Sequence, residues 1–333
     1  IGPLFVHAMM RHLVRSLEDI PLFENTAVTV GSFDGVHVGH RTILERLRVS
    51  ARARGLSSIA ITFEPHHRIY FGREPRPFLL TDLDEKLALL GETSVEHTLV
   101  LPFDGLLAGL SAREFLERVL IDRLGAKLFL VGHDQAIGRD QVRGPKNVAR
   151  SAKGLDLDLE TVPPIDAGGA PVSSTRIRTA LTDGETTVAL ALLGNPYLLT
   201  GKVVHGDERG RQLGYPTANI ALDEPYKLIP APGVYIATAD VLDTPTGDAQ
   251  VRAMLYLGTR PTFDDSRTVV ELFLMDWTGD LYDTRLRVSI YARIRGDMRF
   301  DGASELVERM RRDEEITRTW FDERERCMMK LSM

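Results

Sequence analysis

The sequence predicts an α/β fold in which an N-terminal, doubly wound parallel sheet precedes a small antiparallel β-barrel and a terminal helix. Three observations lead to this prediction. The chain has 333 residues, more than one domain of roughly 100–200 residues would use. Strand-like and helix-like segments alternate through the first half, whereas short strands at close spacing dominate the second. We place the boundary near residue 187, giving domains of 20–186 and 187–333.

The composition limits the class of protein. Hydrophobic residues make up 43% of the chain and charged residues 26%, which is typical of a globular protein. No apolar run approaches the roughly 18 residues needed to cross a bilayer, and the first ten residues lack a charged leader. The net charge of −6 argues against a general nucleic-acid surface. The single cysteine, Cys327, fits a reducing cytoplasm. We expect a cytoplasmic monomer or weak homo-oligomer that binds neither membrane nor nucleic acid.

The most informative run is 31–40 (GSFDGVHVGH), which follows a predicted strand at 27–30. Apolar residues recur at helical spacing through 41–54, so the run forms a strand-to-helix turn. Its glycines let a ligand approach the main chain, and the start of the helix offers unpaired N–H groups and a partial positive charge. If His37 lies in the turn and His40 in the first helical turn, both imidazoles can point at one polyphosphate.

Taken alone, the His-x-x-His pair is equally compatible with a polar loop or a partial metal site, although two ligands without a third are rarely zinc. The run is neither the dinucleotide fingerprint nor the Walker A loop, because the spacing differs and the Lys-Ser/Thr pair is missing. It resembles the His-x-Gly-His signature of the nucleotidylyltransferase superfamily, and 33–35 looks like its bacterial FAD synthetase branch. The resemblance implies catalytic roles for His37 and His40. It implies ATP contacts for Gly31, Ser32, Phe33, Asp34 and Gly39.

The rest of the first half supports the parallel sheet. Further strands are predicted at 57–63, 97–101, 127–131 and 157–162, and helices at 83–90 and 111–124. The second helix opens with a capping box formed by Ser111 and Glu114. Together these segments predict alternating β and α units.

Two polar segments follow predicted strands. In open α/β sheets, ligands lie beyond the carboxyl ends of the strands, which is where His66 falls. A solvated loop histidine is the alternative. The segments around His66 and Asp134 resemble parts of FAD synthetases, which implies flavin contacts for both. His67, Gln135 and Ile137 depart from the family pattern.

A second phosphate motif lies at 173–178 (SSTRIR). Ser or Thr at a helix start caps backbone donors, so a simple N-cap is one interpretation. Hydroxyls and the forked, permanently charged guanidinium of Arg178 also suit phosphate. The run matches the Ser-Ser-Thr-x-Ile-Arg signature that accompanies His-x-Gly-His in the superfamily. The resemblance implies that Ser174 and Thr175 bind ATP and that Arg178 is catalytic.

The second half carries the predicted barrel strands, at 197–205, 233–239, 251–257, 268–275 and 286–294. Residues 210–220 (GRQLGYPTANI) contain a hydroxyl and an amide two residues apart, Thr217 and Asn219, which can coordinate Mg²⁺ jointly with phosphates. A plain turn is the alternative. The run resembles the riboflavin kinase signature, which implies that Gly210 and Thr217 also bind ATP.

Glu271 lies in an apolar run, where an unpaired carboxylate would cost several kcal/mol. It is either a paired structural residue or a general base that takes the proton of a hydroxyl attacking a γ-phosphate. Riboflavin kinases have their base at this position. The run 295–300 is similar to a segment that borders the flavin in these kinases, which implies flavin contacts for Arg295 and Arg299. A helix at 303–312 and a solvated, charge-rich helix at 311–326 follow.

The resemblances cover the chain from about residue 20 to about 315 and identify it as a member of the bifunctional bacterial riboflavin kinase/FAD synthetase family. They imply that the barrel phosphorylates riboflavin with ATP to FMN, and that the N-terminal domain transfers AMP from a second ATP to FMN, giving FAD and pyrophosphate, both with Mg²⁺. Two alternatives stay open. One is a kinase whose adenylyltransferase pocket is impaired at Gln135 and Ile137, and the other is a non-catalytic flavin-sensing module.

Overall fold

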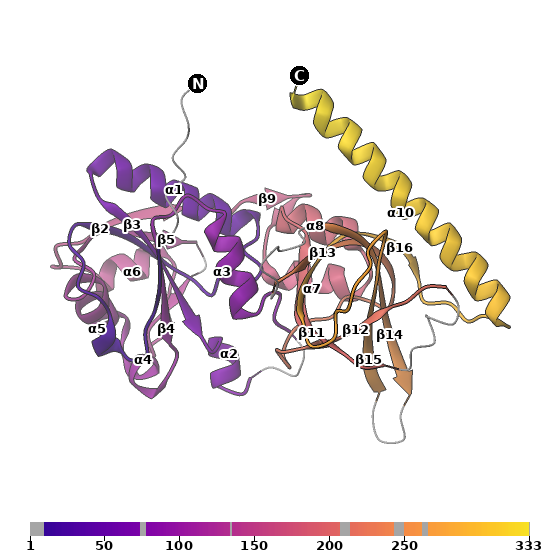
Figure 1. Ribbon diagram of the computed structural model, residues 1–333. Helices are drawn as coiled ribbons and strands as arrows, with labels where there is room; N and C mark the ends of the chain where they lie inside the picture. Colours follow the sequence, from indigo (N-terminus) through magenta and orange to yellow (C-terminus); the bar gives the residue numbers. More distant parts are fainter. Residues whose placement is uncertain are drawn as a thin grey trace. The chain divides into compact units, whose positions relative to one another are not determined.

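The computed structural model describes residues 10–73, 78–133, 135–206, 214–242, 250–261 and 266–332 (Figure 1). The chain divides into two compact units. The first contains Ile1–Pro75 and Leu83–Ser174, and the second contains Arg76–Asp82 and Thr175–Met333. This division falls ahead of residue 187, and the boundary between the functional domains stays a prediction. The predicted site residues Gly210 and Asp134 lie outside the described residues.

The first unit is organised around a six-stranded sheet whose neighbouring strands are all parallel. In spatial order the strands are β1 (Met10–Leu13), β4 (His97–Pro102), β3 (Ser57–Glu64), β2 (Thr26–Val30), β5 (Ala126–Gly132) and β8 (Asp158–Val162). The predicted doubly wound parallel sheet is therefore confirmed. The short edge strand β1 was not predicted, since it offers only four residues and no turn signals.

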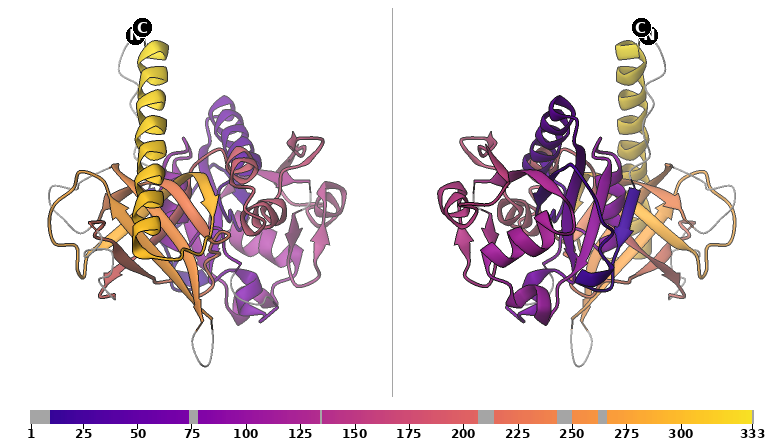
Figure 2. Two further views of the ribbon diagram at one scale, coloured as in Figure 1. Left: turned by 90° about the vertical axis from the view of Figure 1, so that its right-hand side faces the viewer. Right: turned by 90° about the vertical axis from the view of Figure 1, so that its left-hand side faces the viewer.

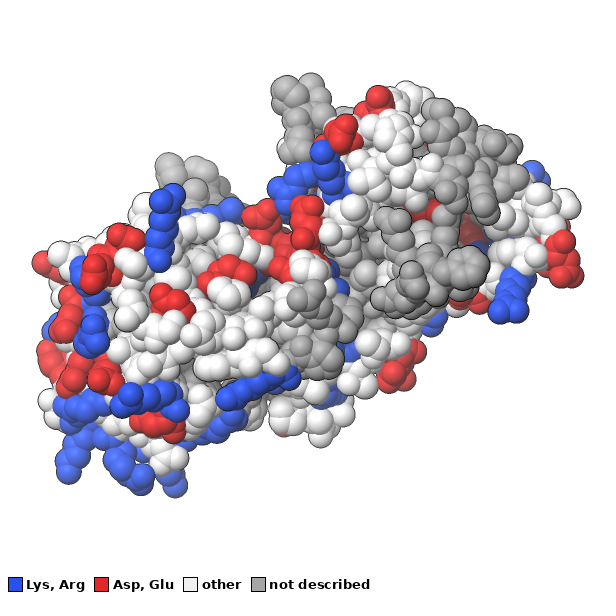
Figure 3. All heavy atoms as spheres, turned by 90° about the horizontal axis from the view of Figure 1, so that it is seen from below, with Lys and Arg blue, Asp and Glu red and all other residues white. Residues whose placement is uncertain are grey.

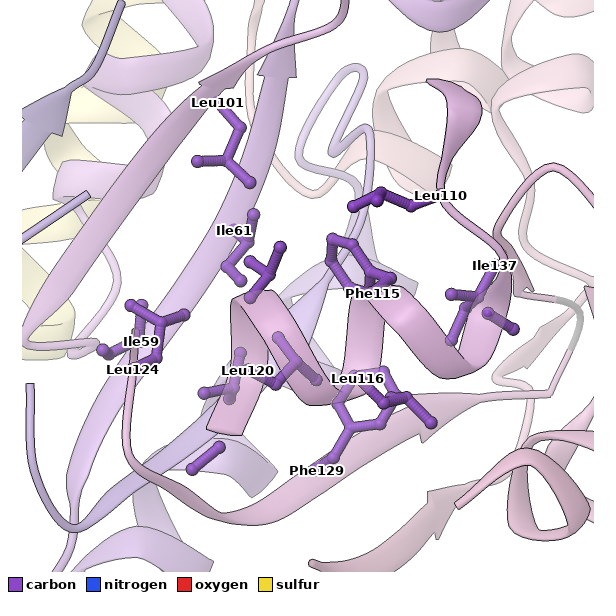
Figure 4. Packing of buried hydrophobic residues seen from close by; sticks show 14 of the residues in the cluster. Ile59, Ile61, Leu101, Leu110, Phe115, Leu116, Leu120, Leu124, Phe129 and Ile137 are labelled. Carbon is purple, nitrogen blue, oxygen red and sulfur yellow. The ribbon is translucent and has the colours of Figure 1, made fainter. Parts of the chain in front are cut away.

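The central strands are buried on both faces, which explains why they are nearly continuous apolar runs in the sequence. One face of the sheet packs against a helical segment in a single hydrophobic cluster (Figure 4). The cluster includes Ile59, Ile61, Leu101 and Phe129 from the strands and Phe115, Leu116, Leu120 and Leu124 from the helical segment. Helix α1 (Val38–Arg54) contacts β2, β3 and β5 through side chains outside this cluster.

The other predicted helices of this unit are also present. They are α3 (Leu83–Gly91) and α5 (Ala112–Phe115), which continues as a π-helical segment at Leu116–Ile121. The capping box is confirmed, because the Glu114 N–H donates to Ser111 Oγ and the Ser111 N–H donates to the Glu114 carboxylate. Several short elements were not predicted: a 3₁₀ turn (Leu17–Asp19), α2 (His67–Tyr70), α4 (Gly105–Gly109), α6 (Pro145–Ser151) and the two-residue strands β6 (Ala136–Ile137), β7 (Val142–Arg143), β9 (Asp166–Ala167) and β10 (Ala170–Pro171).

The second unit contains a closed six-stranded antiparallel barrel (Figure 2). Around the barrel the strands are β11 (Tyr197–Val204), β12 (Ala218–Leu222), β15 (Ser266–Leu274), β14 (Val251–Pro261), β13 (Gly233–Val241) and β16 (Arg285–Gly296). The barrel is confirmed, and all five predicted strands are present. The sixth, β12, was not predicted as a strand, because its residues belong to the polar run 210–220.

Among the residues that the structure describes, three helices accompany the barrel: α7 (Ser174–Thr182), α8 (Thr186–Leu193) and α10 (Ala303–Ser332). Figure 1 shows α10 as one long helix beside the barrel strands, and it contacts β14. The expectation of a solvated helix at 311–326 is wrong for one face, because Asp313, Thr317 and Phe321 are buried. In the parts of the chain that the structure describes, none of the helices is both long and apolar enough to cross a membrane.

Candidate functional site

The strand order has a topological switch point at β2. After β2 the chain continues to β3 and β4 on one side and then returns to β5 on the other. Ligands bind at such a switch point, outside the carboxyl ends of the strands. The glycine-rich run follows β2, and the loop containing Gln135 follows β5. The two segments predicted to bind ATP and flavin therefore start from adjacent strand ends.

Gln135 ties these two strand ends together. Its Nε2 donates to the carbonyl of Val30 at 2.8 Å, and its Oε1 accepts from the N–H of Gly132 at 3.1 Å. A second departure, Ile137, is buried in the hydrophobic cluster of the first unit. Gln135 and Ile137 thus have structural roles in this chain.

The glycine-rich run folds into a tight turn. Phe33, Gly35 and Val36 have φ angles of 47°, 82° and 39°, values that non-glycine residues rarely adopt. Phe33 and Val36 keep them because both side chains are buried in the core. At Gly31 a Cβ would lie 3.1 Å from the Phe33 ring. Backbone strain of this kind persists where surrounding packing enforces it, which is typical of ligand-binding turns.

His37 and His40 form a stacked pair at the start of α1. His37 is the N-cap residue, and its Nδ1 accepts from the backbone N–H of His40 at 3.3 Å. The ring centroids lie 3.6 Å apart at an interplanar angle of 14°. Because Nδ1 of His37 accepts this hydrogen bond, a neutral His37 carries its proton on Nε2, which is then a hydrogen-bond donor. Gly39 makes room for this ring, since a Cβ there would lie 3.2 Å from His37.

Burial, and to a smaller extent the charge of His37, holds the pKa of His40 well below its usual 6.5. His40 as a whole is half-buried, but its Nδ1 is fully buried and has no hydrogen-bond partner among the described residues. The Phe33 ring packs edge-on against the His40 imidazole, with the two ring centroids 5.3 Å apart. Near neutral pH this imidazole is therefore uncharged and offers one N–H donor.

Ser174 joins the second phosphate motif to the turn. Its Oγ donates to the carbonyl of the buried Asp34 at 3.2 Å. The same residue begins α7, so Arg178 follows it by one helical turn and lies on the same face of the helix. Within the second unit, Arg178 Nε donates to the carbonyl of Phe78 at 2.7 Å. Thr175 also belongs to that unit.

His66 lies at the carboxyl end of β3, as predicted, but it is buried rather than solvated. It caps α2 by accepting the N–H of Arg68 at 3.2 Å and stacks on His67 with ring centroids 4.3 Å apart. Nearby, the buried Lys86 donates to the carbonyl of Phe63 at 3.2 Å. Lys86 was not singled out in the sequence, because a lysine within a short apolar helix gives no local signal.

The barrel brings two predicted residues onto one face. Asn219 lies directly opposite Glu271 in the β12–β15 ladder, and directly opposite residues of an antiparallel pair share a face of the sheet. Thr217 precedes Asn219 by two positions and lies just before β12. A Cβ on Gly206 would lie 2.1 Å from Asn219 Nδ2, so this glycine admits the amide side chain.

Glu271 is half-buried and alternates with the buried Val270, Leu272 and Leu274. The carboxylate therefore lies on the face opposite the apolar row and outside the barrel core. The two interpretations of Glu271 made from the sequence, a paired structural residue and a general base, stay predictions.

The two predicted flavin arginines differ in their surroundings. Arg295 Nε donates to Asp313 Oδ2 at 2.8 Å, and its guanidinium lies 5.7 Å from the Phe300 ring centroid. Arg299 is exposed in the segment that follows β16. Arg295 thus joins the barrel to α10.

Two family models match the chain. One described as FAD synthetase matches residues 20–176, and one described as riboflavin kinase matches residues 193–321. The bifunctional riboflavin kinase/FMN adenylyltransferase of Escherichia coli (strain K12) is 35% identical over 298 residues, covering 90% of this chain and 93% of that protein. The protein of the same name from Pseudomonas fluorescens is 37% identical over 291 residues, covering 86% of this chain and 91% of that protein.

A solved structure also matches. The crystal structure of a protein named as a macrolide-efflux protein from Streptococcus pneumoniae is similar with a TM-score of 0.82 and 31% identity, covering 94% of this chain and 100% of the other. Its name differs from those of the curated relatives, which agree with both family models. On the extent and identity of these matches, the chain belongs to the bifunctional riboflavin kinase/FMN adenylyltransferase family.

Proposed function

We propose that this chain makes flavin cofactors in two successive ATP-dependent reactions. The barrel domain phosphorylates riboflavin to FMN. The N-terminal domain then transfers the AMP group of a second ATP to FMN, which gives FAD and pyrophosphate. The observation that carries the AMP transfer is the stacked His37–His40 pair at the start of α1, beside the switch point of the sheet.

In AMP transfer, a phosphate oxygen of FMN attacks the α-phosphorus of ATP, and the bond from that phosphorus to the bridging oxygen breaks as pyrophosphate leaves. The FMN phosphate is already a nucleophile, so this step needs no protein base. His37 and His40 donate hydrogen bonds to the charge that builds on the phosphates, and Arg178 adds a permanent positive charge. ATP is held by main-chain and side-chain groups of Gly31, Ser32, Phe33, Asp34, Gly39, Ser174 and Thr175.

In the kinase reaction, Glu271 takes the proton of the ribityl hydroxyl as its oxygen attacks the γ-phosphorus of ATP, and ADP leaves. The half-buried position of Glu271 beside Asn219 supports this role. Thr217 and Asn219 offer a hydroxyl and an amide oxygen, a donor set that suits Mg²⁺ shared with phosphates. When bound, the ion neutralises charge on the phosphates. Gly210 completes the ATP contacts.

Four further residues bind the flavin in this proposal: His66 and Asp134 in the N-terminal domain, and Arg295 and Arg299 in the barrel domain. The protein works on small molecules in the cytoplasm, as a monomer or weak homo-oligomer, without nucleic acid or membrane. The net charge of −6 supports the absence of a nucleic-acid partner. Figure 3 shows acidic and basic side chains next to one another toward the left end of the face in view and mostly uncharged residues over its centre, whereas nucleic-acid binding typically uses a basic stripe.

A product assay on the whole protein with riboflavin, ATP and Mg²⁺ tests both reactions. We expect FMN and FAD from the unchanged protein. The variant His40→Ala should form FMN but no FAD, because the AMP-transfer step loses a donor to the phosphates. His12→Ala is the matched control, since His12 lies on the edge strand β1, separated from β2 by two strands. Loss of both products in His40→Ala would contradict the assignment of two separate sites.

The same assay separates the alternatives. Product that stops at FMN in the unchanged protein would identify a kinase with an inactive adenylyltransferase site. The bonds of Gln135 to the strand ends favour an intact pocket over that alternative. No ATP-dependent conversion at all would identify a flavin-sensing module.

A further inference from the structure

A segment that precedes α3 belongs to the barrel unit. Phe78–Asp82, here called the 78–82 segment, is assigned to the second unit although it lies within the first half of the sequence. The N–H groups of Phe78 and Leu79 both donate to the carbonyl of Tyr226 at 2.7 Å. The Leu228 N–H donates back to the carbonyl of Leu79 at 2.8 Å. The segment is thus held by the loop between β12 and β13.

Lys227, in the middle of that loop, fixes the segment with its side chain. Its Nζ donates to the carbonyl of Leu80 at 2.6 Å and lies 4.5 Å from the centre of the Tyr197 ring. The residue is only 3% exposed. Burying an ammonium group costs desolvation and side-chain entropy. The Leu80 carbonyl is one partner that compensates this buried ammonium group.

The other end of the segment holds Arg178. The Phe78 carbonyl accepts from Arg178 Nε at 2.7 Å, and the guanidinium lies 5.6 Å from the centre of the Phe78 ring. With Nε fixed in this way, the plane of the guanidinium is set, and with it the direction of the N–H donors on the terminal nitrogens. The contacts form one chain of support, from Lys227 through the 78–82 segment to Arg178.

We propose that Lys227 is a positioning residue for AMP transfer, although it lies in the kinase half of the sequence. It orients Arg178 through the 78–82 segment and does not touch the substrate. This inference rests on the phosphate role of Arg178 proposed above, and it adds a residue that the motifs of the N-terminal domain do not contain.

The effect should be selective for AMP transfer. Tyr197, whose ring contacts the Lys227 ammonium group, is the first residue of β11. Val204 is the last residue of the same strand and is the ladder partner of Asn219. Seven steps of about 3.3 Å along a strand separate these ends by roughly 23 Å. The group of Thr217, Asn219 and Glu271 proposed for the kinase reaction is therefore remote from Lys227 along β11.

The experiment measures the two reactions separately in the full-length protein, riboflavin to FMN and FMN to FAD, with ATP varied in each. For Lys227→Met we expect about a tenfold rise in the KM for ATP of AMP transfer, the effect of weakening one charge-assisted contact, and unchanged phosphorylation of riboflavin. Phe78→Leu, which keeps the carbonyls but removes the ring beside Arg178, should give a smaller rise. Lys202→Met is the matched control, because Lys202 is 47% exposed in an ion pair with Asp283.

A double variant tests the route. Arg178→Ala should lower AMP transfer, and adding Lys227→Met should lower it no further, because the lysine acts through the arginine. If Arg178→Ala has no effect, the proposed role of Arg178 fails. If Arg178→Ala acts but Lys227→Met and Phe78→Leu do not, the inference about Lys227 is overturned. It is also overturned if the effects of Lys227→Met and Arg178→Ala are additive, or if Lys227→Met reduces both reactions equally.

Discussion

Asp313→Asn should weaken the attachment of α10 to the barrel. The Asp313 carboxylate is 2% exposed and lies 2.8 Å from Arg295 Nε and 3.1 Å from Arg309 Nε. Removing one partner of a buried ion pair costs about 3–5 kcal/mol, because the remaining charge stays uncompensated. Arg309 is 27% exposed, so water can compensate part of its charge, and we expect a loss near the lower end, about 3 kcal/mol.

Tryptophan fluorescence during urea unfolding measures this loss. The chain has two tryptophans, Trp277 and Trp320, and both belong to the second unit, so the signal follows that unit alone. For an m value of about 2 kcal/mol per M, a loss of about 3 kcal/mol lowers the urea midpoint by roughly 1.5 M.

Asp322→Asn provides the matched control on the same helix. The Asp322 side chain is 59% exposed and pairs with Arg252 at 3.0 Å, and such surface pairs contribute about 0–1 kcal/mol. Equal midpoints for the two variants would refute the reasoning, because they would mean that burial does not strengthen the attachment made by Asp313.

Two further predictions concern the first unit. Gly138→Ala would place a Cβ 2.1 Å from the backbone nitrogen of Ala112 at a φ of +72°. We therefore expect the free energy of unfolding of this unit to fall by more than about 2 kcal/mol. In a heat-challenge assay, AMP transfer should fall while riboflavin phosphorylation persists. Because burial lowers the pKa of His40, the unfolded chain binds a proton there more readily than the folded chain. This contribution to stability is complete above about pH 6.5 and declines as the pH falls below it. Urea unfolding followed by far-UV circular dichroism at about pH 7.5 and 5.5 should show a smaller decline for His40→Asn, and equal declines would contradict this prediction.

The sequence predicted features that depend on local spacing. His37 and His40 stand three apart after a strand, and the structure places His37 at the N-cap and His40 in the first turn of α1, as expected. Ser111 and Glu114 form the capping box for the same reason. Hydrophobic periodicity was sufficient for the parallel sheet and for most of the barrel, because each strand has one or two faces that must be buried.

Features that depend on distant contacts could not be predicted. Lys227 and Leu80 are 147 positions apart, and neither neighbourhood contains a pattern that indicates the other. Asp313 lies in a charge-rich run that is typical of a solvated helix, and that run does not indicate its ion pair with Arg295 on β16. Glu271 stands out in the sequence as a carboxylate within an apolar run, but the strand alternation places it on the half-buried face, outside the core.

The discontinuous second unit has a consequence for synthesis on the ribosome. The 78–82 segment is made early, but its partner Lys227 follows Leu80 by 147 residues. At about 5–20 residues per second, this interval lasts roughly 7–30 s. During that time Phe78, Leu79 and Leu80, which are buried in the finished protein, have no barrel to cover them. A nascent chain arrested before residue 227 should therefore be more susceptible to proteolysis near residue 80 than one arrested after the barrel is complete.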